Sequence, residues 1–222
     1  MSEPVTVLGL SGSPRRHGNT ETLLDAVLEG AREAGADVEK VVLRTLDYAP
    51  CRGCNACHRT GVCVLRDDLT AVFEKIAAAD VLVLASPIYS MGITAETKGL
   101  IDRAQYLWAR KFILKDLYFT AGHIRRHKGL FVSTAGLGWD NVFDAAFPAV
   151  TAFFNTTGFE YWDNVIANDM DRYGGIAGHP TALAEARGKG RSVVALLREM
   201  RAQNDAETRP SPGAPSDPDE TK

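Results

Sequence analysis

The four cysteines of this 222-residue chain all lie in one short segment, CRGCNACHRTGVC, as Cys51, Cys54, Cys57 and Cys63. A disulfide framework would distribute its cysteines to link distant elements, and it would need an oxidising compartment. Structural zinc sites usually place two ligand pairs a dozen or more residues apart. Three cysteines at intervals of three residues, with a fourth six residues later, suit one compact metal cluster that has four ligand positions. We therefore interpret them as the ligands of one [4Fe–4S] cluster. Structural zinc and free or redox-active thiols are the alternatives, and we expect His58 to be a solvated loop residue.

A second group of reactive residue types, SGSPRRHGNT, lies where an apolar run gives way to a helical pattern. Gly12 and Gly18 let the backbone approach a ligand closely. Besides the free N–H groups of the first helical turn, the groups that can donate to an anion are Ser11, Ser13, Arg15, Asn19 and Thr20. The loop is neither a Walker A motif nor GxGxxG, so it suits a small phosphate monoester better than a triphosphate. An ordinary capped turn is the alternative.

Two further loops follow later apolar runs, SPIYSMG at 86–92 and TAGLGW at 134–139. In a parallel sheet both loops lie on the same edge as residues 11–20, which we call the anion loop. Open α/β sheets bind ligands at this edge. Tyr89, Met91 and Trp139 can flank a flat aromatic ring there. Each aromatic side chain alone is explained as well by ordinary packing. Three such loops together predict a phosphorylated aromatic cofactor.

The elements that must position these loops alternate between strand and helix. Apolar runs predict strands at 5–10, 38–43, 80–86, 129–134 and 159–167. Helical spacing predicts helices at 20–34, from Asp67 or Asp68, at 94–108, from Asp140 or Asn141 to Phe154, and at 181–203, the last weakened by Gly188 and Gly190. This pattern predicts an α/β three-layer sandwich around a parallel sheet. Segments 109–127 and 168–180 are insertions to which we assign no role.

Composition narrows the class of protein. The chain is 45% hydrophobic and 24% charged with net charge −3, typical of a globular protein. No apolar run reaches the ~20 residues that span a bilayer, and we read the short apolar start as a strand rather than a signal peptide. We expect a cytoplasmic protein without a membrane partner.

The charge is concentrated at the C-terminal end. Residues 203–222 hold five acids, two bases and four of the ten prolines, so residues 1–202 are neutral with 23 acids and 23 bases. A neutral body argues against nucleic acid as a partner. We expect one domain at 1–203, with the cysteine loop 44–66 inserted, and a disordered acidic tail at 204–222.

The segments GSPRRHGNTETLL and ASPIYSMGITAETKGLIDR resemble the flavodoxin-like NAD(P)H-dependent FMN reductase superfamily over roughly residues 5–165. The compact cysteine motif resembles the iron–sulfur flavoproteins within it. The resemblance implies a five-stranded parallel sheet of order 2-1-3-4-5, with the cysteine loop after strand 2. It also implies FMN, one [4Fe–4S] cluster, and a homodimer or homotetramer in which a cluster lies near the FMN of a neighbouring chain.

The resemblance also implies the residues that hold each cofactor. The phosphate of FMN falls on Ser11, Ser13, Arg15, Gly18, Asn19 and Thr20. The isoalloxazine ring falls against Pro87, Ile88, Tyr89, Ser90, Met91, Gly92, Thr134, Ala135, Gly136 and Trp139. The cluster ligands fall on Cys51, Cys54, Cys57 and Cys63.

From these residues we expect an electron-transfer oxidoreductase with FMN as a two-electron hub and the cluster as a one-electron port. No side chain is assigned as a catalytic acid or base. The electron donor is NAD(P)H or a ferredoxin-like protein, and the acceptor is a small molecule or a protein. One alternative is an NAD(P)H-dependent FMN or quinone reductase without a cluster, and another is a redox sensor or carrier.

Overall fold

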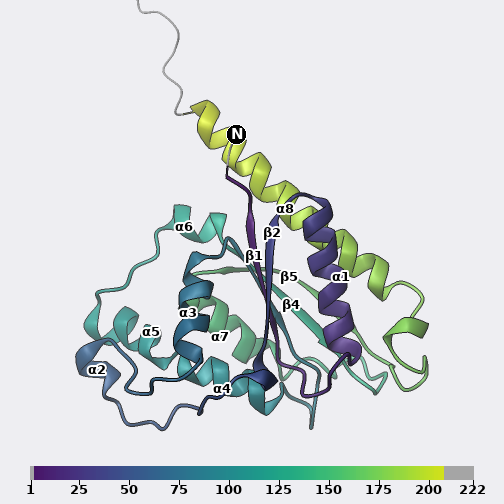
Figure 1. The fold of residues 1–222 in the computed structure, drawn as a ribbon, viewed down its shortest axis with the longest axis horizontal. Helices are drawn as coiled ribbons and strands as arrows, with labels where there is room; N and C mark the ends of the chain where they lie inside the picture. Colours follow the sequence, from purple (N-terminus) through teal and green to yellow (C-terminus); the bar gives the residue numbers. More distant parts are fainter. Residues whose placement is uncertain (1–2, 208–222) are drawn as a thin grey trace, which may run out of the picture.

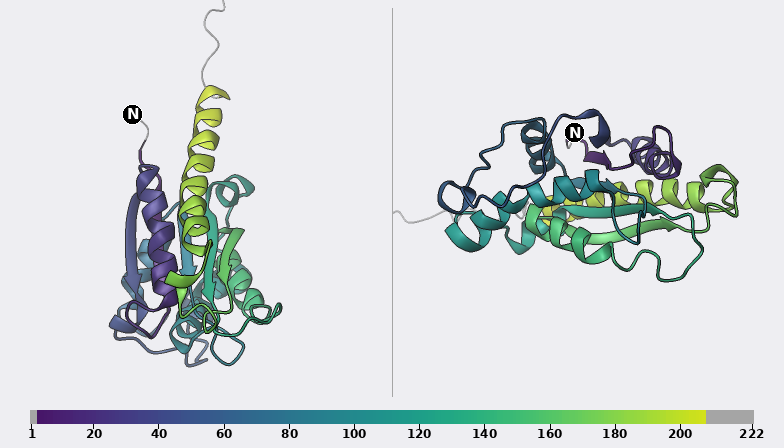
Figure 2. Two further views of the ribbon diagram at one scale, coloured as in Figure 1. Left: turned by 90° about the vertical axis from the view of Figure 1, so that its right-hand side faces the viewer. Right: turned by 90° about the horizontal axis from the view of Figure 1, so that it is seen from below.

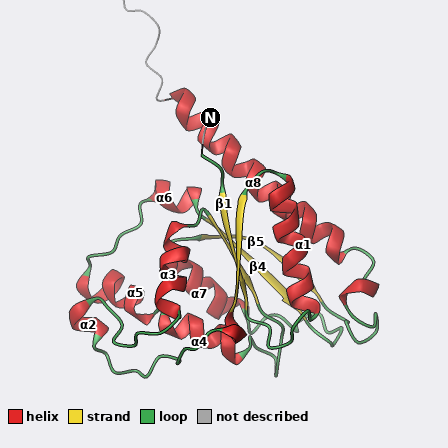
Figure 3. Cartoon of the chain, in the orientation of Figure 1, coloured by secondary structure: helices red, strands yellow, loops and turns green. Residues whose placement is uncertain are grey.

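Five parallel strands form the centre of the molecule, in a computed structural model that describes residues 3–207. They are β1 (Thr6–Ser11), β2 (Asp37–Val42), β3 (Val81–Ala85), β4 (Lys128–Thr134) and β5 (Glu160–Ala167). Their order is β2-β1-β3-β4-β5, and every pair is parallel. Figure 3 shows the strands in yellow, with helices around them in red. The predicted flavodoxin-like α/β sandwich is therefore confirmed. The continuous apolar runs of β1, β3 and β4 are buried on both faces.

Helices cover both faces of this sheet (Figures 1 and 2). On one face, α1 (Asn19–Glu33) and α8 (Ala182–Glu207) pack on residues such as Val7, Val83 and Val132. On the other, α3 (Leu69–Ala78), α4 (Ala95–Arg103) and α7 (Phe147–Thr157) pack around Leu82 and Phe131. None of the described helices has the length and apolar character that crossing a membrane requires.

Three predicted helix boundaries were wrong. The helix expected at 94–108 is divided between α4 and α5 (Gln105–Ala109). The helix expected from Asp140 or Asn141 begins only at Phe147, after a run of turns. Pro148 in its first turn explains this, because proline suits a helix start and cannot donate a bond to a preceding turn. Helix α8 continues to Glu207, four residues into the segment expected to be disordered, and residues 208–222 lie outside the described part.

Short elements complete the chain. The segment 109–127, interpreted as an insertion without an assigned role, contains the π-helical turn η2 (Arg110–Leu114) and α6 (Ala121–Arg126). The segment 168–180 contains only the 3₁₀ turn η3 (Ile176–Gly178). Between β2 and α3 lie the 3₁₀ turn η1 (Leu43–Thr45) and the four-residue helix α2 (Cys57–Thr60). The cysteines are therefore on the connection after β2, as predicted.

The sequence pattern indicated that Gly190 weakens the last helix, but in the structure this glycine has a packing role. A Cβ atom at Gly190 would lie 2.0 Å from the Val27 carbonyl oxygen of α1. A Cβ atom at Gly30 of α1 would likewise lie 2.0 Å from the Arg187 carbonyl oxygen of α8. The two glycines therefore allow the backbones of α1 and α8 to come into direct contact.

We expect Gly190→Ala to lower the free energy of unfolding by about 1–3 kcal/mol, because the added methyl group forces two helices apart. Gly188→Ala is the matched control, since a Cβ atom there would meet nothing within 4 Å. It should raise stability by up to about 1 kcal/mol through helix propensity. Urea denaturation of both variants measures the difference, and equal effects would contradict the packing role.

Candidate functional site

Gly12, the first residue after β1, is fixed by hydrogen bonds to both its backbone N–H and its carbonyl. Its N–H donates to the Ala85 carbonyl at 2.7 Å, and its carbonyl accepts from Thr94 Oγ1 at 2.6 Å. A Cβ atom on Gly12 would lie 1.8 Å from Thr97 Oγ1. Only glycine fits this position, so the path of the anion loop is fixed by its contact with β3 and the start of α4.

The loop leads into the uncapped N-terminus of α1. Gly18 occupies the N-cap position, and within the described part of the chain no side-chain hydrogen bond caps this end of the helix. Ser13 Oγ instead bonds the Arg15 backbone, accepting from its N–H and donating to its carbonyl, both at 3.2 Å. Free N–H groups and the positive end of a 15-residue helix favour an anion here.

A cavity of about 80 Å³ lies beside this helix end. Eleven of the predicted cofactor-binding residues line it: Ser13, Arg15, Gly18, Asn19, Thr20, Pro87, Ile88, Tyr89, Thr134, Ala135 and Gly136. The others, Ser11, Ser90, Met91, Gly92 and Trp139, do not. Ser11 is fully buried, with its hydroxyl unpaired among the described residues. Met91 and Trp139 are exposed on the loops that follow β3 and β4.

Hydrogen bonds join the loops around this cavity. Thr20 Oγ1 and Thr134 Oγ1 are 2.6 Å apart, and the Ile88 N–H donates to the Thr134 carbonyl at 2.9 Å. Asn19 Oδ1 accepts from the Ile176 N–H at 3.0 Å. Sequence reasoning expected Thr20 and Asn19 to donate directly to a phosphate, whereas in this structure their side chains connect loops.

The insertion 168–180 contributes lining residues that sequence reasoning missed. Met170 and Asp171 line the cavity. The Asp171 N–H donates to the Gly136 carbonyl at 3.2 Å, and its carboxylate lies where a Gly136 side chain would be. The length of the insertion was the only signal of this role in the sequence.

Glu21 stabilises the anion loop through hydrogen bonds. Sequence reasoning did not identify this residue. Its buried carboxylate accepts from Arg44 at 2.9 Å, from the His17 N–H at 3.0 Å and from Lys40 at 3.4 Å. Arg44 also donates to the Ser13 carbonyl at 3.3 Å. Burial by itself raises the pKa of Glu21, but the hydrogen bonds from Arg44 and His17 and the charges of Arg44 and Lys40 together lower it.

All four cysteines are among the residues that line a separate cavity of about 180 Å³. All are free thiols; Cys54 is exposed and the others are half-buried. Burial raises the pKa of the Cys57 thiol, and its three cysteine neighbours raise it further. Within residues 3–207, no three His, Cys, Asp or Glu side chains converge closely enough to hold a single metal ion. The thiols thus border a space and do not meet at a point.

Comparisons with known proteins identify the family. A family model described as "NADPH-dependent FMN reductase" matches residues 5–153, well over half of the chain. The chain belongs to this family. This is a family of flavin-dependent oxidoreductases. The resemblance inferred from the sequence is therefore confirmed.

Relatives of this family member include proteins named iron–sulfur flavoproteins. One from Methanosarcina thermophila is 38% identical over 110 residues, 50% of this chain and 58% of that protein. One from Methanocaldococcus jannaschii is 40% identical over 101 residues, 46% of this chain and 52% of that protein. The chain therefore matches about half the length of these relatives.

A solved structure supports the fold of this family member. A NAD(P)H:quinone oxidoreductase from Methanothermobacter marburgensis superposes with a TM-score of 0.63 and 19% identity, covering 86% of this chain and 98% of that one. At this identity the likeness concerns the fold alone.

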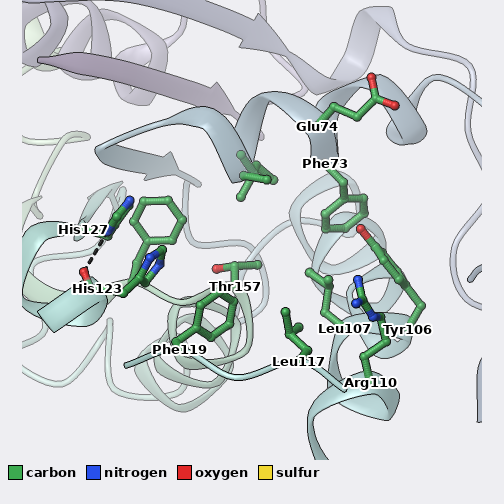
Figure 4. Close-up of a pocket in the computed structure, with 13 residues that line it drawn as sticks. Phe73, Glu74, Tyr106, Leu107, Arg110, Leu117, Phe119, His123, His127 and Thr157 are labelled. Atoms are coloured by element: carbon green, nitrogen blue, oxygen red, sulfur yellow. Dashed lines mark hydrogen bonds between the residues drawn. The ribbon is translucent and has the colours of Figure 1, made fainter. Parts of the chain in front are cut away.

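A third cavity, of about 260 Å³, contains none of the predicted residues. Figure 4 shows His123 and His127 on one side of it and Tyr106 and Arg110 on the opposite side. The two histidine rings stack at 3.7 Å, and burial lowers the pKa of His123. Tyr106 also lines the cysteine cavity.

His58, expected to be a solvated loop residue, is half-buried. Its ring centroid lies 6.1 Å from that of Trp108, and its Nε2 has no partner among the described residues. The expectation failed because α2 packs against α5, a long-range contact that local polarity does not reveal.

We expect Glu21→Gln to lower the free energy of unfolding by about 3 kcal/mol at pH 7, because it leaves the largely buried Arg44 without its anion, whereas Lys40 keeps Asp25 as a partner. The folded-state pKa of Glu21 is lowered, so the carboxylate stabilises the fold fully above its unfolded-state pKa of about 4.3. This stabilisation is lost as the pH falls through the folded-state pKa. Denaturation curves from pH 7 to 3 should therefore converge for the two proteins, and a gap that stays constant would refute the ion-pair role.

Proposed function

We propose that this chain is an FMN-dependent oxidoreductase that passes electrons between FMN and a [4Fe–4S] cluster. The observation that carries the proposal is the presence, in one chain, of an anion-binding loop at the sheet edge and a separate cavity bordered by four thiols. The family and the names of its iron–sulfur relatives support both halves of the proposal.

The anion loop fits the phosphate of FMN. The uncapped end of α1 offers backbone donors, and Arg15 lines the cavity with a positive charge. Gly18 leaves room that a side chain would fill, since a Cβ atom there would lie 3.1 Å from Arg15 Cβ. Exposed Tyr89, Met91 and Trp139 offer apolar surface for a flat ring at the same edge. These residues would hold FMN.

The cysteine cavity fits a cluster better than a zinc ion. Zinc requires four ligands within about 2.3 Å of one point, whereas these thiols border a volume of about 180 Å³. A cubane cluster distributes its thiolates over four corners and suits such a space. The residues that would hold it are Cys51, Cys54, Cys57 and Cys63.

When bound, FMN exchanges electrons in pairs or singly and the cluster exchanges them one at a time. The work of the protein is to bind, orient and shield these groups. Ser13, Arg15 and the first turn of α1 anchor the phosphate, and the bond between Thr20 and Thr134 holds the loops around it. We assign no proton transfer to a side chain. We further propose a homodimer or homotetramer, and NAD(P)H or an electron-transfer protein as the donor.

The second candidate function is an NAD(P)H-dependent FMN or quinone reductase in which the cysteines play no part. The family description favours it, because it names NADPH as the donor. It predicts that a chain without iron still oxidises NADPH through its flavin.

We expect Arg15→Ala to weaken FMN binding about tenfold to a hundredfold, since a hydrogen bond to a charged group contributes about 1.5–3 kcal/mol. Arg16→Ala is the matched control: it removes the same charge from the neighbouring exposed residue, which does not line the cavity. Flavin fluorescence titration measures both affinities. Equal losses would argue for general electrostatic attraction, not a bound phosphate.

We expect Cys57→Ala to lose the cluster and keep its flavin. Iron, acid-labile sulfide and flavin are measured on anaerobically purified protein, with values near four, four and one expected for the unmodified chain. Arg59→Ala, an exposed residue of the same short helix, is the control and should keep all three. An unmodified chain with flavin but no sulfide after cluster reconstitution would favour the second candidate.

A further inference from the structure

Arg103, the last residue of α4, bonds the backbone at both ends of the cysteine loop. Its side chain is only 3% exposed. Nη1 donates to the Ala49 carbonyl at 2.8 Å, and Nη2 donates to the Leu65 carbonyl at 3.4 Å. Ala49 lies two residues before Cys51, and Leu65 lies two residues after Cys63. One buried side chain thus joins the two ends of the segment that carries all four thiols.

The charge of Arg103 has a carboxylate partner and a sulfur neighbour. Nη1 donates to Asp67 Oδ2 at 2.5 Å, which lowers the pKa of Asp67 despite its burial. Cys63 is also a neighbour of the guanidinium, which bonds the Leu65 carbonyl two residues further along the chain. Arg103 Nε is buried and has no acceptor among the described residues. A buried donor without a partner indicates that the guanidinium can donate one more hydrogen bond at this end of the cysteine loop.

We propose that Arg103 is a positioning residue that sets the electron affinity of the group held by the four thiolates. The inference rests on the proposed function, in which that group is a [4Fe–4S] cluster. One-electron reduction of the cluster, by the reduced FMN of the proposed function, would add one negative charge to the cluster and would form or break no bond. A buried guanidinium beside one ligand favours the reduced state, because cluster potentials follow net charge and hydrogen bonds to sulfur. Asp67 opposes this effect by compensating part of the charge.

The test is a pair of variants that must shift the potential in opposite directions. Arg103→Gln removes the cation, and the ratio of reduced to oxidised cluster at the wild-type midpoint should fall about tenfold, which corresponds to 59 mV for a one-electron couple. Asp67→Asn removes the opposing anion, so the ratio should rise. Arg103→Lys retains the charge without the planar fork, and its potential should lie closer to wild type than that of Arg103→Gln.

Redox titration of the full chain, followed by the absorbance and spin signal of the cluster, measures these ratios. Lys98→Gln is the matched control, because it removes the same charge from an exposed residue of the same helix that pairs with Asp102. Solvent screens this charge, so its ratio should equal that of wild type. Iron and sulfide content is determined first for every variant.

Each outcome supports or overturns the inference. Opposite shifts in Arg103→Gln and Asp67→Asn support it, because a merely structural role would not reverse sign. Shifts in one common direction, or shifts no larger than that of Lys98→Gln, overturn it while leaving the proposed function intact. If Arg103→Gln holds no cluster, Asp67→Asn decides: a raised ratio supports the inference and an unchanged one overturns it. A wild-type chain without iron and sulfide overturns the proposed function itself.

Discussion

The close approach at Gly12 is the constraint on which the sheet edge depends. Its N–H extends the pairing with β3 by one residue, and its carbonyl accepts from the Thr94 hydroxyl. The same hydroxyl oxygen accepts from the Thr97 N–H as the N-cap of α4. One side chain therefore both begins a helix and satisfies a buried carbonyl of the anion loop. The direction of α4 and the path of the loop cannot change independently.

Helix α4 transmits this constraint from one site to the other. Thr94 at its start bonds the anion loop, and Arg103 at its end bonds both ends of the cysteine loop. Nine helical residues span roughly 14 Å at 1.5 Å each. A rigid element of that length keeps the two loops at a set separation.

Two buried ion pairs have the same design. Glu21 with Arg44 braces the anion loop, and Asp67 with Arg103 braces the cysteine loop. Each carboxylate also accepts backbone N–H groups, from His17 in the first case and from Ala49 and Leu69 in the second. Buried pairs of this kind add little net stability, since desolvation offsets much of their attraction. Their effect is to hold irregular backbone in one conformation beside a site that needs defined geometry.

Much of the fold was predictable because buried strands and helices have a characteristic spacing of apolar residues along the sequence. Continuous apolar runs marked β1, β3 and β4, and helical spacing marked α1 and α3. Errors arose where tertiary contact overrides local pattern. Gly190 was interpreted as a weakness of α8, and only the nearby Val27 carbonyl explains it. The helix predicted to begin at Asp67 or Asp68 has Asp68 as its N-cap residue, but the bond between Asp67 and Arg103 was not foreseen.

The sequence by itself determined the fold class, the parallel sheet, the grouping of four thiols and the arrival of three loops at one edge. These follow from periodicity and from the rule that parallel strands end together. Only the tertiary structure decided which polar groups pair across the chain, such as Asn19 with Ile176, which are 157 residues apart. Burial repeats along a segment and can be read from spacing. A hydrogen bond between distant residues depends on where two backbones meet in space, and no local pattern records that.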